Sequence, residues 1–391
     1  MLLFSFDLKD DSIFAGFGAL PPGITSLPPE QLRDFVGRFA ELERRLLGET
    51  FLAARRITRW PLGRVTLNGS SVGFPAHADI YLQAHKSRVA LWEIWLHAAE
   101  QPFSASRWID WLNPESDNSV VAQLWRALAP IHEAIAVRPT LSGNFFPVIM
   151  LRLPQHPIKA IVEQHGHDIV RLLFLHDARW TLKRKLVLEE LERDYCAREG
   201  GMTLLARRSG LDLHARESLV DEEDFANLPP RTALPFVVTL EILLLERAVL
   251  QRLNERLTGA TAGSVDDLLA LKREIRDALE EYYGAITTAT RFSDAITVVG
   301  ERLLNIDNLY EAVMDRLEVV SFEITTRYQK RMMTFQFWLT IVFGATEIGF
   351  IASGIATWHY RTNLTAVLAW TIGAAVLSGI ALVSLLRGKL N

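Results

Sequence analysis

Two long apolar stretches near the C-terminal end constrain this 391-residue chain more than any other feature. They run from Met332 to His359 and from Leu364 to Leu386, and only the segment HYRTN, residues 359–363, lies between them. Each is long enough to cross about 30 Å of hydrocarbon as a helix. Helices in soluble cores rarely stay apolar on every face for so long. The sequence therefore predicts a transmembrane hairpin, with Glu347 as its one internal charge.

Basic residues flank the hairpin on one side. Arg327, Lys330 and Arg331 precede the first span, and Arg387 and Lys389 follow the second. The connecting loop carries only Arg361. The positive-inside rule then places both ends of the hairpin in the cytoplasm. We expect a multi-pass protein of the inner (plasma) membrane, with its N- and C-termini cytoplasmic and residues 1–331 forming a cytoplasmic body.

The residues before the hairpin predict mixed helices and strands. We expect strands at Leu2–Phe6, Ala78–Gln83, Ala90–Trp95, Ile169–Leu175 and Met202–Arg207. We expect helices at Pro29–Leu47, Ser119–Val137 and Leu182–Glu199, and an acidic, proline-rich linker at Gly210–Pro235. The expected fold is an α+β cytoplasmic domain over residues 1–235, a helical hairpin and stalk over 236–331, and a two-helix transmembrane hairpin with a basic tail over 332–391.

The stalk carries the most regular periodic signal. Its apolar residues alternate in steps of three and four: Ile296, Val299, Leu303, Ile306, Tyr310, Val313, Leu317, Val320 and Ile324. Such heptads are typical of helices packed side by side, as in a coiled coil. A second interpretation is one helix lying on the core of its own domain. No proline occurs between Ser293 and Asn391, so the pattern predicts a single rod of about 65 residues, roughly 100 Å long, from Ser293 through the first span.

The soluble part carries few signs of catalysis. It has no glycine-rich phosphate loop, no G-x-S-x-G and no H-E-x-x-H, so we do not expect an enzyme. A net charge of −4 argues against nucleic acid as a partner. We interpret Cys196, the one cysteine, as structural. His165 and His167, or the acidic run Asp221–Asp224, are metal candidates, with a surface role as the alternative for each.

The order of these parts resembles the CorA-like metal ion transporter superfamily. The closest local match is FIASGIATW, residues 350–358, which stands where those transporters carry F-I-A-G followed by the G-M-N signature. That signature is absent here, because Ala356, Thr357 and Trp358 stand near its place. The loop between the spans is also shorter than is usual in the family. The chain thus resembles a divergent member.

The resemblance implies a homopentamer in the lipid bilayer, with the first span lining a central pore. In the family the signature and its loop gather hydrated magnesium, so their absence implies cation transport without clear magnesium selectivity. The resemblance leaves divalent cations such as Mg²⁺, Zn²⁺ and Co²⁺ as substrates or regulators. It assigns no metal-ligating residue in this chain and no resident cofactor.

Two faces of the first span are candidates for the pore lining. One stripe contains Thr340, Gly344, Glu347, Ile351 and Gly354, spaced by fours and threes. A charge at mid-membrane usually faces water or a partner, and a ring of carboxylates attracts cations. The other stripe comes from the family resemblance and contains Thr346, Gly349, Ser353 and Ala356. The two stripes cannot both face one axis, and the first is favoured on the cost of burying Glu347 in lipid.

Small and aromatic residues in the spans have alternative roles. Ala345, Gly349 and Ser353, like Ala375 and Gly379 in the second span, also suit close helix packing without conduction. Phe335 and Trp338 suit an interfacial aromatic belt at the cytoplasmic end, and they are also gate candidates that would close the pore by dewetting.

The function expected from the sequence is that of a homo-oligomeric cation channel or transporter, gated by movement of its stalk helices. The alternative is a membrane-anchored sensor or effector that permeabilises the membrane on a cytoplasmic signal.

Overall fold

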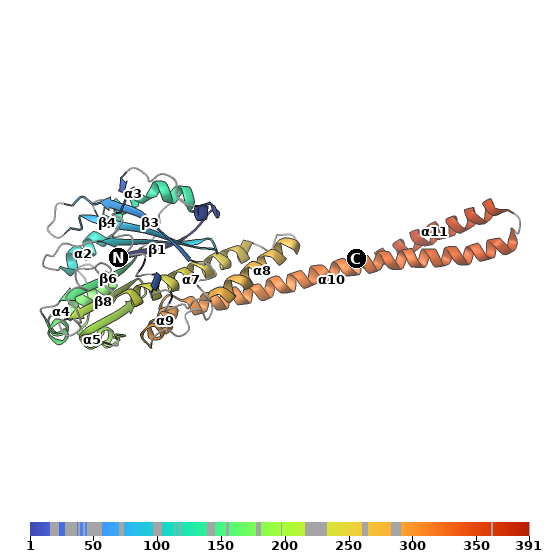
Figure 1. Ribbon diagram of the computed structural model, residues 1–391. Helices are drawn as coiled ribbons and strands as arrows, with labels where there is room; N and C mark the ends of the chain where they lie inside the picture. The colour runs from blue at the N-terminus through green and yellow to red at the C-terminus, as the bar shows by residue number, and fades with distance from the viewer. Residues whose placement is uncertain are drawn as a thin grey trace. The chain divides into compact units, whose positions relative to one another are not determined.

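The computed structural model of the chain (Figure 1) describes residues 1–15, 23–27, 37, 40–41, 44, 57–69, 74–96, 104–113, 115–116, 119–138, 145–153, 156–176, 181–196, 198–215, 233–259, 265–282, 291–360 and 363–390. The chain forms two compact units. The first contains Met1–Ala260 and Arg273–Arg316, and the second contains Thr261–Lys272 and Leu317–Asn391.

An eight-stranded mixed sheet organises the first unit. Its strands are β1 (Leu2–Asp7), β2 (Ile24–Thr25), β3 (Ile57–Thr66), β4 (His77–His85), β5 (Val89–Leu96), β6 (Phe146–Leu153), β7 (Gly201–Ala206) and β8 (Ser209–Ala215). They follow the order β2-β3-β4-β5-β1-β6-β8-β7, with β6 and β8 parallel and the other pairs antiparallel. The expected strands at Leu2–Phe6, Ala78–Gln83, Ala90–Trp95 and Met202–Arg207 are confirmed, whereas β3 and β6 were not expected.

Helices cover both faces of this sheet. The elements outside the sheet are the 3-10 turn η1 (Ser12–Ala15) and the helices α2 (Ala105–Leu112), α3 (Val120–Ile135), α4 (Ile158–Phe174), α5 (Arg184–Leu191), α7 (Leu234–Gly259), α8 (Val265–Tyr282) and α9 (Arg291–Leu303). On one face, α2 to α5 pack against two apolar clusters, one of them around the fully buried Trp92. On the other face, α7 packs against β1, β5 and α9. The first unit therefore has three layers, helix, sheet and helix.

Strand alternation explains which side chains meet each layer. In β4, Ile80 and Leu82 belong to the apolar cluster. Tyr81 and Gln83 point to the other face because successive strand residues alternate. That second face is buried too, so this domain places polar side chains in its interior.

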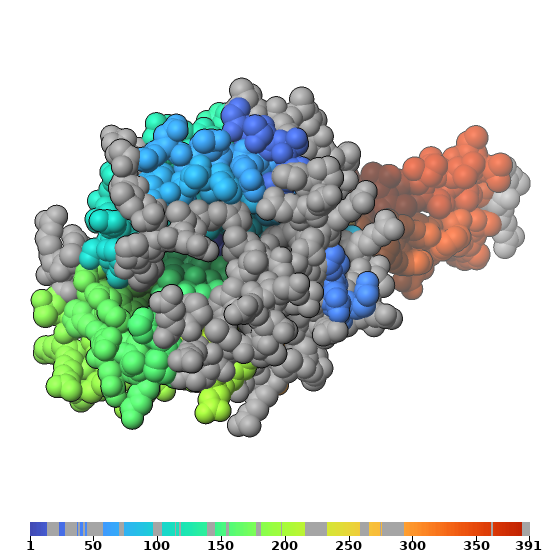
Figure 2. Space-filling view, turned by 60° about the vertical axis from the view of Figure 1, so that its left-hand side comes forward, coloured from blue at the N-terminus to red at the C-terminus, as the bar shows by residue number. Residues whose placement is uncertain are grey.

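Two very long helices carry the expected spans. They are α10 (Ile306–His359) and α11 (Leu364–Leu390). Each contains a window long and apolar enough to cross a membrane, of which only 17% in α10 and none in α11 is buried. This exposure separates them from the buried core helices of soluble proteins. Their exposed surfaces are drawn in orange and red in Figure 2.

The structure corrects three expectations about the soluble part. Ile169–Leu175 was expected as a strand, but it is the C-terminal part of α4, because a short apolar run suits a buried helix as well as a strand. The helix expected at Leu182–Glu199 is confined to α5. The linker expected from Gly210 begins instead with strand β8.

Helix α3 is confirmed, with the Ser119 hydroxyl accepting a hydrogen bond from the Ala122 N–H. Most of Pro29–Leu47 lies outside the described residues.

The single rod expected from Ser293 is also interrupted. Helix α9 ends at Leu303 and α10 begins at Ile306. Between them Asn305 has a φ of 62°, in the left-handed region that ends helices. Asparagine tolerates this conformation better than most residues. The heptad spacing continues across the break, which is why the pattern did not reveal it.

Candidate functional site

The hairpin of α10 and α11 is held together by small residues on facing sides of the two helices. A Cβ added at Gly349 would lie 3.2 Å from the Ala375 Cβ, and one added at Gly379 would lie 3.8 Å from the Ala345 Cβ. Ala356 is buried on the same side of α10. Small residues let helix backbones approach closely in lipid. This packing is the role that the sequence suggested as the alternative to a pore lining for Ala345, Gly349 and Ser353.

The stripe that contains Glu347 lies largely outside this seam. Thr340, Glu347, Ile351 and Gly354 are exposed, while Gly344 is half-buried beside Leu382. Within the described part of the chain, nothing lies within 4 Å of a Cβ built at Gly354.

The stripe taken from the family resemblance lies mainly in the seam. Gly349 and Ala356 are buried and Ser353 is half-buried, so a second helix already covers these positions within one chain. Thr346 is exposed, and its hydroxyl donates to the Val342 carbonyl in its own helix. Of the two stripes, the one with Glu347 is left open to another surface.

Aromatic residues mark both ends of the first span. Phe335 and Trp338 are exposed at one end, and Trp358 is exposed at the other. Trp338 and Trp358 are separated by about 30 Å along an α-helix, the thickness of the hydrocarbon layer. This spacing matches two interfacial belts. The exposure of Phe335 and Trp338 within one chain fits both roles expected for them, an interfacial aromatic belt and a pore gate.

Part of the heptad face of α10 is used within a single chain. Val313, Val320 and Ile324 are buried without any second copy, which favours the interpretation of a helix packed on its own chain. Other apolar residues of α10 remain uncovered, and Val319 and Phe322 are 61% and 72% exposed.

A buried polar cluster lies on the face of the sheet toward α7, and sequence reasoning missed it. The Arg59 guanidinium on β3 lies 3.2 Å from a carboxylate oxygen of Glu93 on β5 and 2.8 Å from one of Glu241 on α7. Gln83 donates to the same Glu241 oxygen at 2.8 Å, and the Trp95 indole N–H donates to Glu93. A buried ion pair is costly unless its partners are well placed. The cluster therefore fixes α7 to the sheet.

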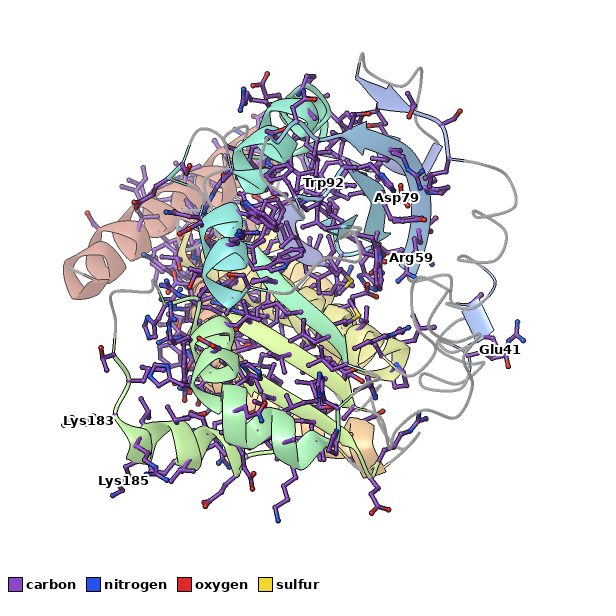
Figure 3. All side chains as sticks on the ribbon, turned by 90° about the vertical axis from the view of Figure 1, so that its left-hand side faces the viewer. Glu41, Arg59, Asp79, Trp92, Lys183 and Lys185 are labelled. Carbon is purple, nitrogen blue, oxygen red and sulfur yellow. The ribbon has the colours of Figure 1, made fainter. Side chains whose placement is uncertain are left out.

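A second charged pair extends this polar face toward the sheet edge. Arg64 and Asp79, on neighbouring strands, form a two-point contact at 2.6 and 3.0 Å. Figure 3 shows Arg59 and Asp79 on neighbouring strands. Burial, with the carboxylates of Asp79 and Glu93 nearby, raises the pKa of Tyr81. The alternation of polar and apolar residues in HADIYLQAH, residues 77–85, was the sequence signal for this face.

The metal candidates do not form a site in the described part of the chain. His165 and His167 are exposed on α4, and no three His, Cys, Asp or Glu side chains among the described residues are placed to hold a metal ion. The run Asp221–Asp224 lies outside the described residues. Cys196 lies in a segment without regular secondary structure after α5.

Comparisons of the chain with protein-family models, with curated proteins and with solved structures found no match.

Proposed function

We propose that this protein is a self-assembling membrane protein whose hairpins surround a cation pathway lined by the Glu347 stripe. The proposal keeps the architecture that the sequence shares with CorA-like transporters: a pentamer with cytoplasmic termini in the inner membrane. It passes cations without strong preference for magnesium, since the G-M-N signature is absent. Movement of α10 opens and closes the pathway.

The observation that carries the proposal is the position of Glu347. It lies near the middle of the first span and outside the seam with α11. No hydrogen bond or ion pair to its carboxylate is present among the described residues. A lone charge facing lipid is costly. A water-filled passage between several copies removes that cost, and it gives the carboxylates a role in attracting cations.

The uncovered apolar residues of α10 support assembly. Val319 and Phe322 lie one helical turn apart, before the membrane span begins. Exposed apolar side chains grouped on one helix face are typical of interaction surfaces. Packing of a second copy on this face brings neighbouring first spans together.

The buried polar cluster supports a role for the soluble domain in gating. Arg59 contacts Glu93 on the sheet and Glu241 on α7, so the cluster ties the position of α7 to that of the sheet. Helix α7 in turn packs on α9, which leads through Asn305 into α10.

Current recording in planar bilayers tests the proposal. Wild type is expected to pass cations over anions, and Glu347→Gln is expected to reduce conductance and this selectivity severalfold. Glu318→Gln, which removes an exposed charge before the span, serves as the charge-matched control and should leave selectivity unchanged. Absence of current in any salt, or identical behaviour of Glu347→Gln and wild type, would reject the pathway.

The size of the solute that crosses the membrane separates the two interpretations of the hairpin. A selective pathway passes ions and retains a trapped dye such as carboxyfluorescein in vesicles. Release of that dye would support the effector that permeabilises the membrane instead. The mass of the detergent-solubilised assembly gives the number of copies, and a monomer would contradict a shared pathway.

A further inference from the structure

Strand β8 holds a histidine in a defined orientation on the face of the sheet toward α7. Asp212 and His214 lie two residues apart and so share one face. The His214 Nε2 lies 2.8 Å from Asp212 Oδ2, and the Thr203 hydroxyl donates to Asp212 Oδ1 at 2.7 Å. The carboxylate oxygen accepts the proton of Nε2, so this contact assigns the lone pair of the neutral imidazole to Nδ1.

The other nitrogen of this imidazole, Nδ1, lies on the same side of Gly201 as the one cysteine of the chain. Nδ1 of His214 is buried and has no hydrogen-bond partner among the residues that the structure describes. Gly201 lies opposite His214 in the β7–β8 pair. A Cβ added at Gly201 would lie 2.5 Å from Cys196 Sγ and 3.7 Å from His214 Nδ1. Both atoms therefore lie beside the position that a side chain at residue 201 would take, and the glycine leaves that position to the cysteine sulfur.

Backbone contacts hold the cysteine at this place. An Asp194 side-chain oxygen accepts hydrogen bonds from the backbone N–H groups of Cys196 and Thr203, each at 2.8 Å. The segment after α5 is thereby fixed to β7. Burial raises the pKa of the Cys196 thiol, with the carboxylates of Asp212 and Asp194 as further causes. The thiol is therefore protonated at neutral pH, and a reaction at its sulfur needs a base within reach.

We propose that Cys196 is a nucleophilic thiol with His214 as its general base and Asp212 as the residue that positions His214. The site would take a small carbon electrophile, such as an activated acyl ester. In that reaction Nδ1 of His214 takes the thiol proton as Sγ bonds to the carbonyl carbon. His214 then gives this proton to the departing alkoxide, which leaves as the alcohol. The acyl group stays on Cys196 as a thioester. This site is separate from the membrane pathway and does not depend on it.

Alkylation by iodoacetamide tests the site, because every alkylated thiol is Cys196. Sγ displaces iodide and the thiol proton passes to His214. The rate is measured by mass spectrometry between pH 5.5 and 9. Wild type is expected to react about tenfold or more faster at pH 7 than His214→Asn, and its rate should fall less steeply as the pH is lowered. His214→Asn should lose about tenfold per pH unit below the pKa of the thiol. His165→Asn, at an exposed histidine of α4, is the matched control.

Two further measurements keep the test decisive. If His214→Asn does not fold, Asp212→Asn takes its place. This variant should be alkylated more slowly than wild type at pH 7, but faster than a chain without the histidine. Burst release of p-nitrophenol from p-nitrophenyl acetate, equal to one per chain and absent in Cys196→Ser, would support acyl transfer. Identical pH profiles in wild type and in the folded His214 or Asp212 variant would overturn the proposal. Stoichiometric protection of the thiol by Zn²⁺ alone, without any burst, would overturn it in favour of a metal site.

Discussion

Gly349 on α10 and Ala375 on α11 leave almost no space between the two helices, since a Cβ at position 349 would lie 3.2 Å from that of Ala375. Gly349→Leu is therefore expected to force the helices apart and to destabilise the hairpin by about 1–3 kcal/mol. Thermal unfolding in detergent micelles measures this loss. Gly373→Leu is the control, because nothing lies within 4 Å of a Cβ at that position. Equal melting temperatures for the two variants would contradict the packing described.

The Arg59 cluster predicts a large effect of a single substitution. Arg59→Met leaves the carboxylates of Glu93 and Glu241 buried without their cation. Breaking a buried pair in this way costs about 3–5 kcal/mol. Arg138→Met removes a similar contact, to Glu255, at an exposed place, and should cost about 0–1 kcal/mol. Urea unfolding of both variants gives the comparison, and similar losses would show that the buried cluster contributes no more than a surface pair.

Because of the buried His132, we expect the free energy of unfolding to fall in acid. Burial lowers the pKa of His132 from 6.5 to about 4, and its Nδ1 accepts from the Trp92 indole N–H. The unfolded chain takes up a proton near pH 6.5, whereas the folded chain does not until about pH 4. The free energy of unfolding therefore falls as pH drops through this window, by about 1–3 kcal/mol from this group.

Replacing the histidine tests that assignment. His132→Gln is expected to flatten the dependence of unfolding free energy on pH between 6.5 and 4, whatever it does to stability at pH 8. His165→Gln replaces an exposed histidine and should leave the slope unchanged. The prediction fails if the slope of His132→Gln equals that of wild type.

Because of the buried Glu246 on α7, we expect the free energy of unfolding to fall as the pH rises. Burial, with the carboxylates of Glu301 and Asp307 nearby, raises the pKa of Glu246 from 4.5 to about 8. The folded chain keeps a proton that the unfolded chain releases near pH 4.5, so stability falls as pH rises toward 8. Glu246→Gln removes this cost and should stabilise the protein by about 2–4 kcal/mol at pH 8 and by little at pH 4.5. Denaturant titrations at both values measure the gain, and Glu163→Gln on the surface of α4 is the control.

The uncovered face of α10 predicts an effect on assembly without an effect on folding. Phe322→Glu places a charge on an exposed side chain, so the chain alone should unfold as before. If a second copy packs there, the mass of the detergent-solubilised assembly should fall. Val298→Glu alters an exposed apolar residue of α9 and should leave the mass unchanged. An unchanged mass for Phe322→Glu would remove this face from the interface.

Long or strictly alternating patterns were readable from the sequence. The two spans follow from their apolar length, strand β4 from its alternation, and β5 from a short run rich in β-branched and aromatic residues. The end of α4 was misassigned because a mostly apolar segment, 169–175, interrupted only by Arg171, fits a buried strand as well as a buried helix. The break at Asn305 was missed because one residue in a left-handed conformation leaves the heptad spacing unchanged.

The sequence revealed a candidate site only where all of its residues lie on one helix or strand. The exposed Glu347 stripe lies within one helix, so its spacing was visible in the sequence. Which of the two stripes packs against α11 depends on how the two helices contact each other. The spacing of residues within α10 does not reveal that contact. The Cys196 and His214 pair was missed for the same reason. A turn and two strands bring these residues together across 18 positions, although the D-x-H spacing of Asp212 and His214 in a strand was a signal.

The turn at Asn305 has a consequence for how the long helix can be redirected. Hydrogen bonds from Leu304 N–H to the Gly300 carbonyl and from Leu309 N–H to the Asn305 carbonyl complete the helices on each side of it. A change in backbone torsion at this one joint can therefore alter the angle of α10 while both helices keep their internal bonds. An unbroken helix would have to unwind a turn for the same change, whereas here the torsions of one residue, Asn305, set the direction in which α10 leaves α9.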